Sequence, residues 1–165
     1  MVKLTCLYLT LFFFSCKDNL YVSNVNEHIL IAKEDTVKNT YAFYNINGIK
    51  KTGDYQMVFT DTIFKYGMVA DSGIFLIDTS GKHVYEIFKY DNGPDSPGEG
   101  LIRIIKNGKI GYADANTYEI IIEPQYDCAY PFENGKAKVS KNCSTVADGE
   151  NISWTSEDWL YITKK

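Results

Sequence analysis

KNGKIGYADANTYEIIIEPQYD, residues 106–127, predicts a strand, a tight turn, a second strand, another turn and a third strand. Its Asn107-Gly108 pair suits the positive φ values that a two-residue hairpin turn demands. Ile and Tyr, which strands favour, dominate the segments on either side. Hardly any side chain of a catalytic type occurs in it, so the stretch favours a structural β unit.

The stretch recurs along the chain with a period that is typical of repeat proteins. Residues 78–91, DTSGKHVYEIFKYD, and residues 114–127, DANTYEIIIEPQYD, both open with Asp and end with Tyr-Asp. Asp78 and Asp114 are 36 residues apart, and Asn45 takes the same position 33 residues before Asp78. Such a period indicates repeated supersecondary units. Asn-Gly turn signals occur at Asn47-Gly48, Asn92-Gly93, Asn107-Gly108 and Asn134-Gly135.

Each unit is expected to contain three short strands, one of which follows a Gly, one precedes the Asp and one precedes the Tyr-Asp. No segment of eleven or more residues has the apolar stripe of a helix. The predicted fold class is therefore all-β: tandem three-stranded hairpin repeats of about 33–36 residues that form an antiparallel repeat sheet array.

Two strands carry predictions about their faces. In residues 135–139, GKAKV, Ala137 and Val139 are expected on one side and the two lysines on the other, which leaves one face in water. Residues 119–124, EIIIEP, run apolar without a break, as in a strand covered on both sides, and Pro124 is expected to end the ladder pairing.

Residues 100–139, GLIRIIKNGKIGYADANTYEIIIEPQYDCAYPFENGKAKV, resemble the unit of the WG-repeat family. The Trp-Gly pair itself is absent, and Ile110-Gly111, Phe75-Leu76 and Trp159-Leu160 stand in its place. The resemblance covers most of residues 28–165. It implies a β-rich repeat module of bacterial surface and exported proteins, without a general catalytic activity and without a specified ligand.

Length and charge limit the possible partners. The chain has 165 residues and a mass of 18.8 kDa, which fits one domain with a core of its own. Its 17 Lys and Arg face 21 Asp and Glu, and the net charge is −4. Because no basic cluster forms a phosphate-binding stripe, nucleic acid is not expected as a partner.

The first sixteen residues, MVKLTCLYLTLFFFSC, have the layout of an export signal, with Lys3 before an apolar run over residues 4–14. That run is shorter than the roughly 20 residues of a membrane-spanning helix. The Ser-Cys end resembles the lipobox of bacterial lipoproteins, which implies lipidation of Cys16 as the mature N-terminus. Phe13 and Phe14 depart from that pattern, and a buried apolar strand is the alternative interpretation.

These features divide the chain into a signal peptide (1–16), a linker (17–27) and a repeat domain (28–165). Export favours an oxidising compartment, where Cys128 and Cys143 are candidates for a disulfide. Two buried free thiols are the open alternative. No His lies near either Cys and no C-x-x-C occurs, which argues against zinc.

Catalytic residues are not expected. The two histidines, His28 and His83, stand outside any catalytic or metal-binding motif, and the sequence contains no motif for a cofactor. The loop 90–100, YDNGPDSPGEG, holds Asp91, Asp95 and Glu99. We interpret it as a flexible connector, with a calcium loop as the alternative.

The insert 140–159 is the candidate for partner binding, since long loops on a rigid β scaffold commonly carry function. Trp159 takes the family's Trp position and is expected in the core. The other tryptophan either contacts a protein, peptide or glycan partner or folds back over the sheet edge. The candidate partner-binding residues are Trp154, Asp148, Glu150 and Glu157.

The sequence therefore favours a non-enzymatic exported lipoprotein, anchored by lipid at the cell envelope on its periplasmic or surface face, that binds an envelope partner. A structural scaffold without a specific ligand is the second hypothesis. A hydrolase is the third, and it would involve His83.

Overall fold

The computed structural model of the protein describes residues 28–148 and 151–164. The expected signal peptide with Cys16 and the linker 17–27 lie outside the described residues. All regular secondary structure in the described part is β-strand. No helix there is long and apolar enough to cross a membrane.

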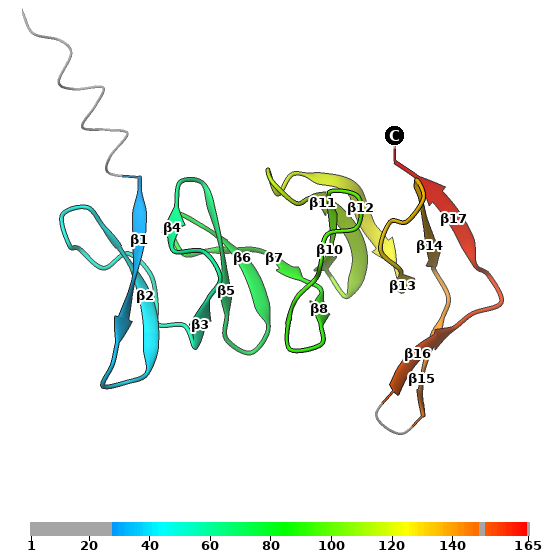
Figure 1. Ribbon diagram of the computed structural model, residues 1–165, viewed down its shortest axis with the longest axis horizontal. Coiled ribbons are helices and arrows are strands. Elements are labelled where there is room, and N and C mark those ends of the chain that lie inside the picture. The colour runs from blue at the N-terminus through cyan, green and yellow to red at the C-terminus, as the bar shows by residue number, and fades with distance from the viewer. Residues whose placement is uncertain (1–27, 149–150, 165) are drawn as a thin grey trace, which may run out of the picture.

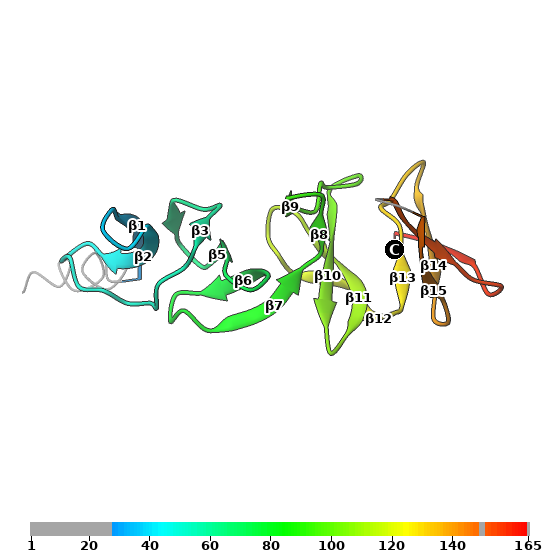
Figure 2. The same ribbon diagram turned by 90° about the horizontal axis from the view of Figure 1, so that it is seen from below.

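The strands follow one another as four units in a row, running in chain order along the longest axis of the molecule (Figures 1 and 2). Unit one contains β1 (Leu30–Asp35), β2 (Thr40–Asn45), β3 (Met57–Val58) and β4 (Thr62–Ile63). Unit two contains β5 (Tyr66–Ala70), β6 (Ile74–Asp78) and β7 (His83–Ile87), and the short strands β8 (Lys89–Tyr90) and β9 (Gly93–Pro94) follow it. Unit three contains β10 (Leu101–Lys106), β11 (Lys109–Asp114) and β12 (Ile120–Tyr126). Unit four contains β13 (Cys128–Ala129), β14 (Lys136–Ser140), β15 (Ser144–Asp148), β16 (Asn151–Thr155) and β17 (Leu160–Thr163).

The pairing is antiparallel throughout, and one sheet joins units two and three and also includes β3 of unit one, which pairs with β5. That sheet has seven strands in the order β12-β11-β10-β7-β6-β5-β3, and the pairing of β7 with β10 connects the two units. Unit one forms the sheet β2-β1-β4, and unit four forms β13-β14-β17. The predicted all-β antiparallel repeat array is confirmed.

The same turn chemistry closes the second strand of three units. Asp114 Oδ1 accepts the backbone N–H groups of Asn116 and Thr117 at 2.9 and 2.8 Å. Asp78 Oδ1 accepts those of Ser80 and Lys82, and the amide oxygen of Asn45 does the same for its own turn. These Asx turns explain why the sequence repeats Asp or Asn at this position.

The shared turn also corrects our alignment of the units. Asp78 corresponds to Asp114, so Ile74-Phe75 stands where unit three has Ile110-Gly111. The expected placement of Phe75-Leu76 at this position was wrong by one residue.

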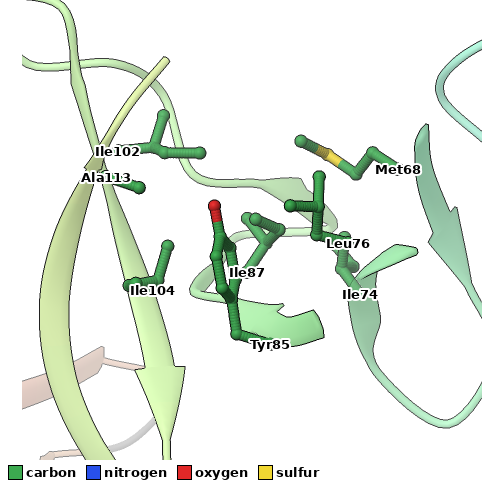
Figure 3. Packing of buried hydrophobic residues seen from close by; sticks show 8 residues of the cluster. All are labelled: Met68, Ile74, Leu76, Tyr85, Ile87, Ile102, Ile104 and Ala113. Carbon is green, nitrogen blue, oxygen red and sulfur yellow. The ribbon is translucent and has the colours of Figure 1, made fainter. Parts of the chain in front are cut away.

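The hydrophobic core is divided into three clusters, each of which lies between two successive units. Figure 3 shows the second cluster, in which residues of unit two face Ile102, Ile104 and Ala113 of unit three. This nearest-neighbour packing is the arrangement of a repeat protein. The clusters are Leu30, Phe43, Tyr55, Ile63, Val69 and Ile77; then Met68, Ile74, Leu76, Tyr85, Ile87, Ile102, Ile104 and Ala113; then Leu101, Ile110, Tyr112, Tyr126, Ala129, Phe132, Ala137 and Val139.

Strands of the middle units divide their side chains between two clusters. On β10, Leu101 packs toward unit four whereas Ile102 packs toward unit two. On β11, Tyr112 packs toward unit four and Ala113 toward unit two. Successive side chains of a strand point to opposite faces, so one strand contributes to both neighbouring cores.

The structure confirms the prediction of which side chains of β14 are buried, but not the one for β12. Ala137 and Val139 of β14 are buried and Lys136 is exposed, as expected. The prediction that residues 119–124 are covered on both sides was wrong. β12 is the edge strand of its sheet, and its burial alternates, with Ile121 43% exposed.

Pro124 does not end the pairing of β12, contrary to expectation. β12 continues to Tyr126, which pairs with Ile110. The register shifts between this pair and the pair Tyr112–Ile122. A Cβ on Gly111 would lie 2.5 Å from the carbonyl oxygen of Ile122. The strand accommodates proline because glycine opposite lets the two backbones approach closely.

Both segments interpreted as loops contain hairpins. Within residues 140–159, β15 pairs with β16 over five residue pairs, from Ser144↔Thr155 to Asp148↔Asn151. At the start of the segment 90–100, β8 pairs with β9 over residues 89–94. Asp95 follows β9 and is buried against Arg103, so this segment is a structured part of the fold and not the flexible connector expected.

Trp159 is half-buried and lies outside the core clusters, so the expectation of a core position was wrong. Tyr161 of β17 pairs with Lys138 on the face of unit four that points away from unit three. Trp159 lies two residues earlier and shares that face. The ammonium of Lys138 lies 4.4 Å from the centre of its ring.

Candidate functional site: an aromatic groove

Trp154 of β16 lies against two rings from distant parts of the chain. Its ring centre is 5.8 Å from that of Phe88 and 5.3 Å from that of Tyr130, with interplanar angles of 74° and 75°. Phe88 lies between β7 and β8, and Tyr130 follows β13. The hairpin β15–β16 thus folds back and brings Trp154 to the point where units three and four meet.

The three rings line an open concavity of about 1020 Å³, which we call the aromatic groove. Tyr90, 63% exposed, and Tyr130, 36% exposed, present aromatic surface to solvent. Concave sites lined by aromatic rings with a few polar groups are the usual form of a ligand site. The lining residues are Phe88, Lys89, Tyr90, Asp91, Asp95, Ser96, Pro97, Gly98, Arg103, Tyr130, Pro131, Ser153 and Trp154.

A buried ion pair forms the base of the groove. Arg103 and Asp95 are only 4% and 6% exposed. Asp95 Oδ2 accepts the backbone N–H of Arg103 at 2.8 Å and its Nε–H at 3.0 Å, and Oδ1 accepts from the second guanidinium nitrogen. The guanidinium also donates to the carbonyl oxygen of Ala129 at 3.2 Å and stacks 4.1 Å from the ring centre of Phe88. One arginine therefore connects the β8–β9 segment, β10 and β13.

Tyr130 is positioned by a buried hydroxyl. The phenol of Tyr112, at the centre of the core between units three and four, donates to the carbonyl oxygen of Tyr130 at 2.7 Å. Burial raises the pKa of Tyr112 well above its ordinary value of 10, so it stays a neutral donor at physiological pH. The backbone of Tyr130 is thus fixed from within the core.

The hairpin that carries Trp154 is fastened at its base. A disulfide joins Cys128, at the start of β13, to Cys143, just before β15, with their Cα atoms 6.2 Å apart. Beside it, the hydroxyl oxygens of Ser140 and Ser156 are 2.8 Å apart, and Ser156 donates to the carbonyl oxygen of Asn142 at 2.7 Å. Both ends of the insert are therefore tied to unit four.

The acidic residues expected beside Trp154 are Asp148, Glu150 and Glu157. Glu157 is exposed in the segment after β16, outside the groove lining. Asp148 lies at the far end of β15, where its backbone pairs with Asn151. Glu150 lies outside the described residues.

The histidines and the loop acids have ordinary structural surroundings. His83 is exposed and stacks on Phe75 with ring centres 4.2 Å apart, and His28 is exposed at the start of the described chain. Glu99 accepts the N–H of Gly135, and Asp95 is paired with Arg103. Two of the three acids of the calcium hypothesis, Glu99 and Asp95, therefore already bind groups of the protein itself.

Three contributors to the groove were missed by the sequence reasoning: Phe88, Tyr130 and Arg103. Nothing in their local sequence separates them from ordinary strand and turn residues. One signal was available, because Arg103 is a charged residue inside the otherwise apolar run LIRII of residues 101–105. A charge at a buried strand position requires a partner.

The fold and the groove together define an all-β repeat protein with an aromatic site at the junction of two units. Residues 110–142, from β11 through β14, match the family model described as "WG containing repeat". The match confirms the resemblance seen in the sequence over these residues. No curated protein and no solved structure matches the chain.

Proposed function

We propose that this protein is a non-enzymatic binding protein of the cell envelope, whose repeat array captures a protein, peptide or glycan partner in the aromatic groove. The observation that carries the proposal is the convergence of Phe88, Tyr130 and Trp154 from three separate segments. Partly exposed aromatic rings in a pocket with a rigid base are the usual anchors of a binding interface.

Export and lipid anchoring belong to the same proposal. Cys16 follows an apolar run and would carry the lipid, and residues 17–27 would separate the membrane from the repeat array. The disulfide between Cys128 and Cys143 supports export, since disulfides persist mainly in oxidising compartments.

Affinity capture from an envelope extract tests the proposal. The full chain, as the host processes it, is compared with Trp154→Ala and with Tyr90→Ala, whose ring is 63% exposed and makes no core contact. Phe64→Ala is the matched control, because Phe64 is 71% exposed and lies outside the groove. We expect one partner to be retained by the native chain and by Phe64→Ala, and to be lost with both groove variants.

Equal recovery from all four proteins, or from none, would contradict the proposal and leave the scaffold hypothesis. Melting temperatures decide the role of Trp154 independently. If Trp154→Ala melts like the native chain, its loss of capture reports binding. If it melts much lower, Tyr90→Ala supplies the decisive result.

A further inference from the structure

The chemistry of the aromatic groove narrows the class of its partner, on the assumption that the proposed function is correct. Trp154 stands nearly perpendicular to both Phe88 and Tyr130. Perpendicular rings form corners, not a flat platform. A sugar stacks best on one broad, open ring face, whereas a compact apolar ring such as the pyrrolidine of proline fits into a corner between two rings.

The charge of the groove points to a neutral occupant. The Asp95 carboxylate is buried and neutralised by the guanidinium of Arg103. Lys89 and Asp91, both exposed, are the remaining charged residues of the lining and have opposite signs. A strongly anionic or cationic chain would therefore gain little in this groove.

The hydrogen-bonding groups of the lining also fit one kind of chain. The indole of Trp154 is a donor only, and the hydroxyls of Tyr90, Tyr130 and Ser96 can donate. A polyproline II segment has no internal hydrogen bonds, so its carbonyl oxygens are free, while proline lacks the N–H that other residues carry. The hydrogen-bond donors of the groove therefore match the free carbonyl oxygens of such a peptide.

We propose that the aromatic groove binds a proline-rich peptide segment in the polyproline II conformation. Several kinds of peptide-binding domain hold such segments in aromatic-lined grooves, because the helix is already formed and loses little conformational entropy on binding. In this chain the corners beside Trp154 receive proline rings, and the donors around them receive the carbonyl oxygens of the peptide.

Calorimetric titration of the full chain with a blocked deca-proline peptide tests this inference. The matched peptide is a Gly-Ser decamer, which has the same length without the fixed conformation. We expect saturable binding of deca-proline alone, weakened at least tenfold by Tyr130→Ala and by Tyr90→Ala. Phe64→Ala should bind like the native chain, and Phe64→Ala and Tyr90→Ala should keep the melting temperature of the native chain, since both side chains are mostly exposed. Tyr130 also packs on Trp159, so Tyr90→Ala decides if Tyr130→Ala melts lower.

Groove-dependent binding of deca-proline supports the inference whatever the envelope capture yields. Absence of binding, equal binding of the Gly-Ser decamer, or unchanged binding in both tyrosine variants overturns it. The proposed function is then judged separately. A partner captured through Trp154 that deca-proline does not displace leaves the binding function standing with a different ligand, which competition with a neutral oligosaccharide would identify as a glycan.

Discussion

The junction between units two and three differs from the junction between units three and four in how the backbone takes part. Each buries eight residues in its core cluster, so the amount of apolar packing is similar. At the first junction β7 pairs with β10 and a single sheet crosses from unit to unit. At the second, β12 and β14 belong to separate sheets.

Side chains replace the missing backbone ladder at the second junction. Arg103 donates to Ala129, Tyr112 donates to Tyr130, and Glu99 accepts the N–H of Gly135 at 3.0 Å. Each of these bonds joins a side chain of unit three, or of the segment before it, to the backbone of unit four. The aromatic groove thus lies at the junction where the sheet is interrupted and side chains supply the connections.

The largest expected effect comes from breaking the buried ion pair. Arg103→Met leaves the Asp95 carboxylate buried without its partner, which typically costs about 3–5 kcal/mol of folding free energy. Urea unfolding measures the loss. Hydrogen exchange should accelerate in β14 and β17 but much less in β5 and β6, because Arg103 connects only the second junction.

The double variant Arg103→Met, Asp95→Leu is the control for this prediction. Without an unpaired charge it should regain much of the lost stability. Equal losses in the single and double variants would mean that the packing of the arginine against Phe88, and not its charge, stabilises the junction.

Removal of the disulfide is expected to have an intermediate effect. Cys128 and Cys143 are 15 residues apart, and a loop of that size corresponds to about 3 kcal/mol in the chain-entropy model. Replacing both by Ala should lower the melting temperature and accelerate exchange in β15 and β16, with no change in β10 and β11. Dithiothreitol should reproduce the effect in the native chain and leave the variant unaffected. An unchanged melting temperature would contradict this role.

The smallest expected effect concerns acid stability. Hydrogen bonds from Ser80 lower the pKa of Asp78, and the backbone N–H groups of Thr117 and Asn116 lower the pKa of Asp114, in each case from 3.8. A lowered folded-state pKa stabilises the fold above the unfolded value, and this contribution disappears as the pH falls through the folded-state pKa. Stability should therefore decline below about pH 5.

Asp78→Asn with Asp114→Asn should flatten that decline, because Asn45 closes the equivalent turn of unit one without a charge. Thermal unfolding between pH 2 and pH 6 measures the slope. Part of the decline should remain in the double variant, because the hydrogen bond from Lys50 also lowers the pKa of Asp54 in unit one. An unchanged slope would assign acid sensitivity to other carboxylates.

Repetition made part of this fold predictable. Asp78, Asp114 and Asn45 could be aligned from sequence because each closes a turn with its own local hydrogen bonds. Asn107-Gly108 and Asn134-Gly135 also behave as expected, with positive φ at both residues of each pair. Asn92-Gly93 does not, because the β8–β9 hairpin turns one residue earlier, with Asp91 at φ 54°.

The groove was less predictable because it depends on contacts between units. The length of its insert singled out Trp154 in the sequence, yet its neighbours Phe88 and Tyr130 lie 66 and 24 residues earlier. Local periodicity carries no information about which linker a hairpin folds against. The Arg103–Asp95 pair has the same origin, since the β8–β9 hairpin determines where Asp95 lies.

The sharing of each middle strand between two cores limits how the gene can change. Deleting one codon within β10 would exchange the positions of Leu101 and Ile102 and spoil two clusters at once. Insertions and deletions should therefore be tolerated only between strands, where they leave the side chains of both clusters in place. The β15–β16 hairpin lies at such a place, between β14 and β17, and new binding loops would arise in this array by lengthening its turns.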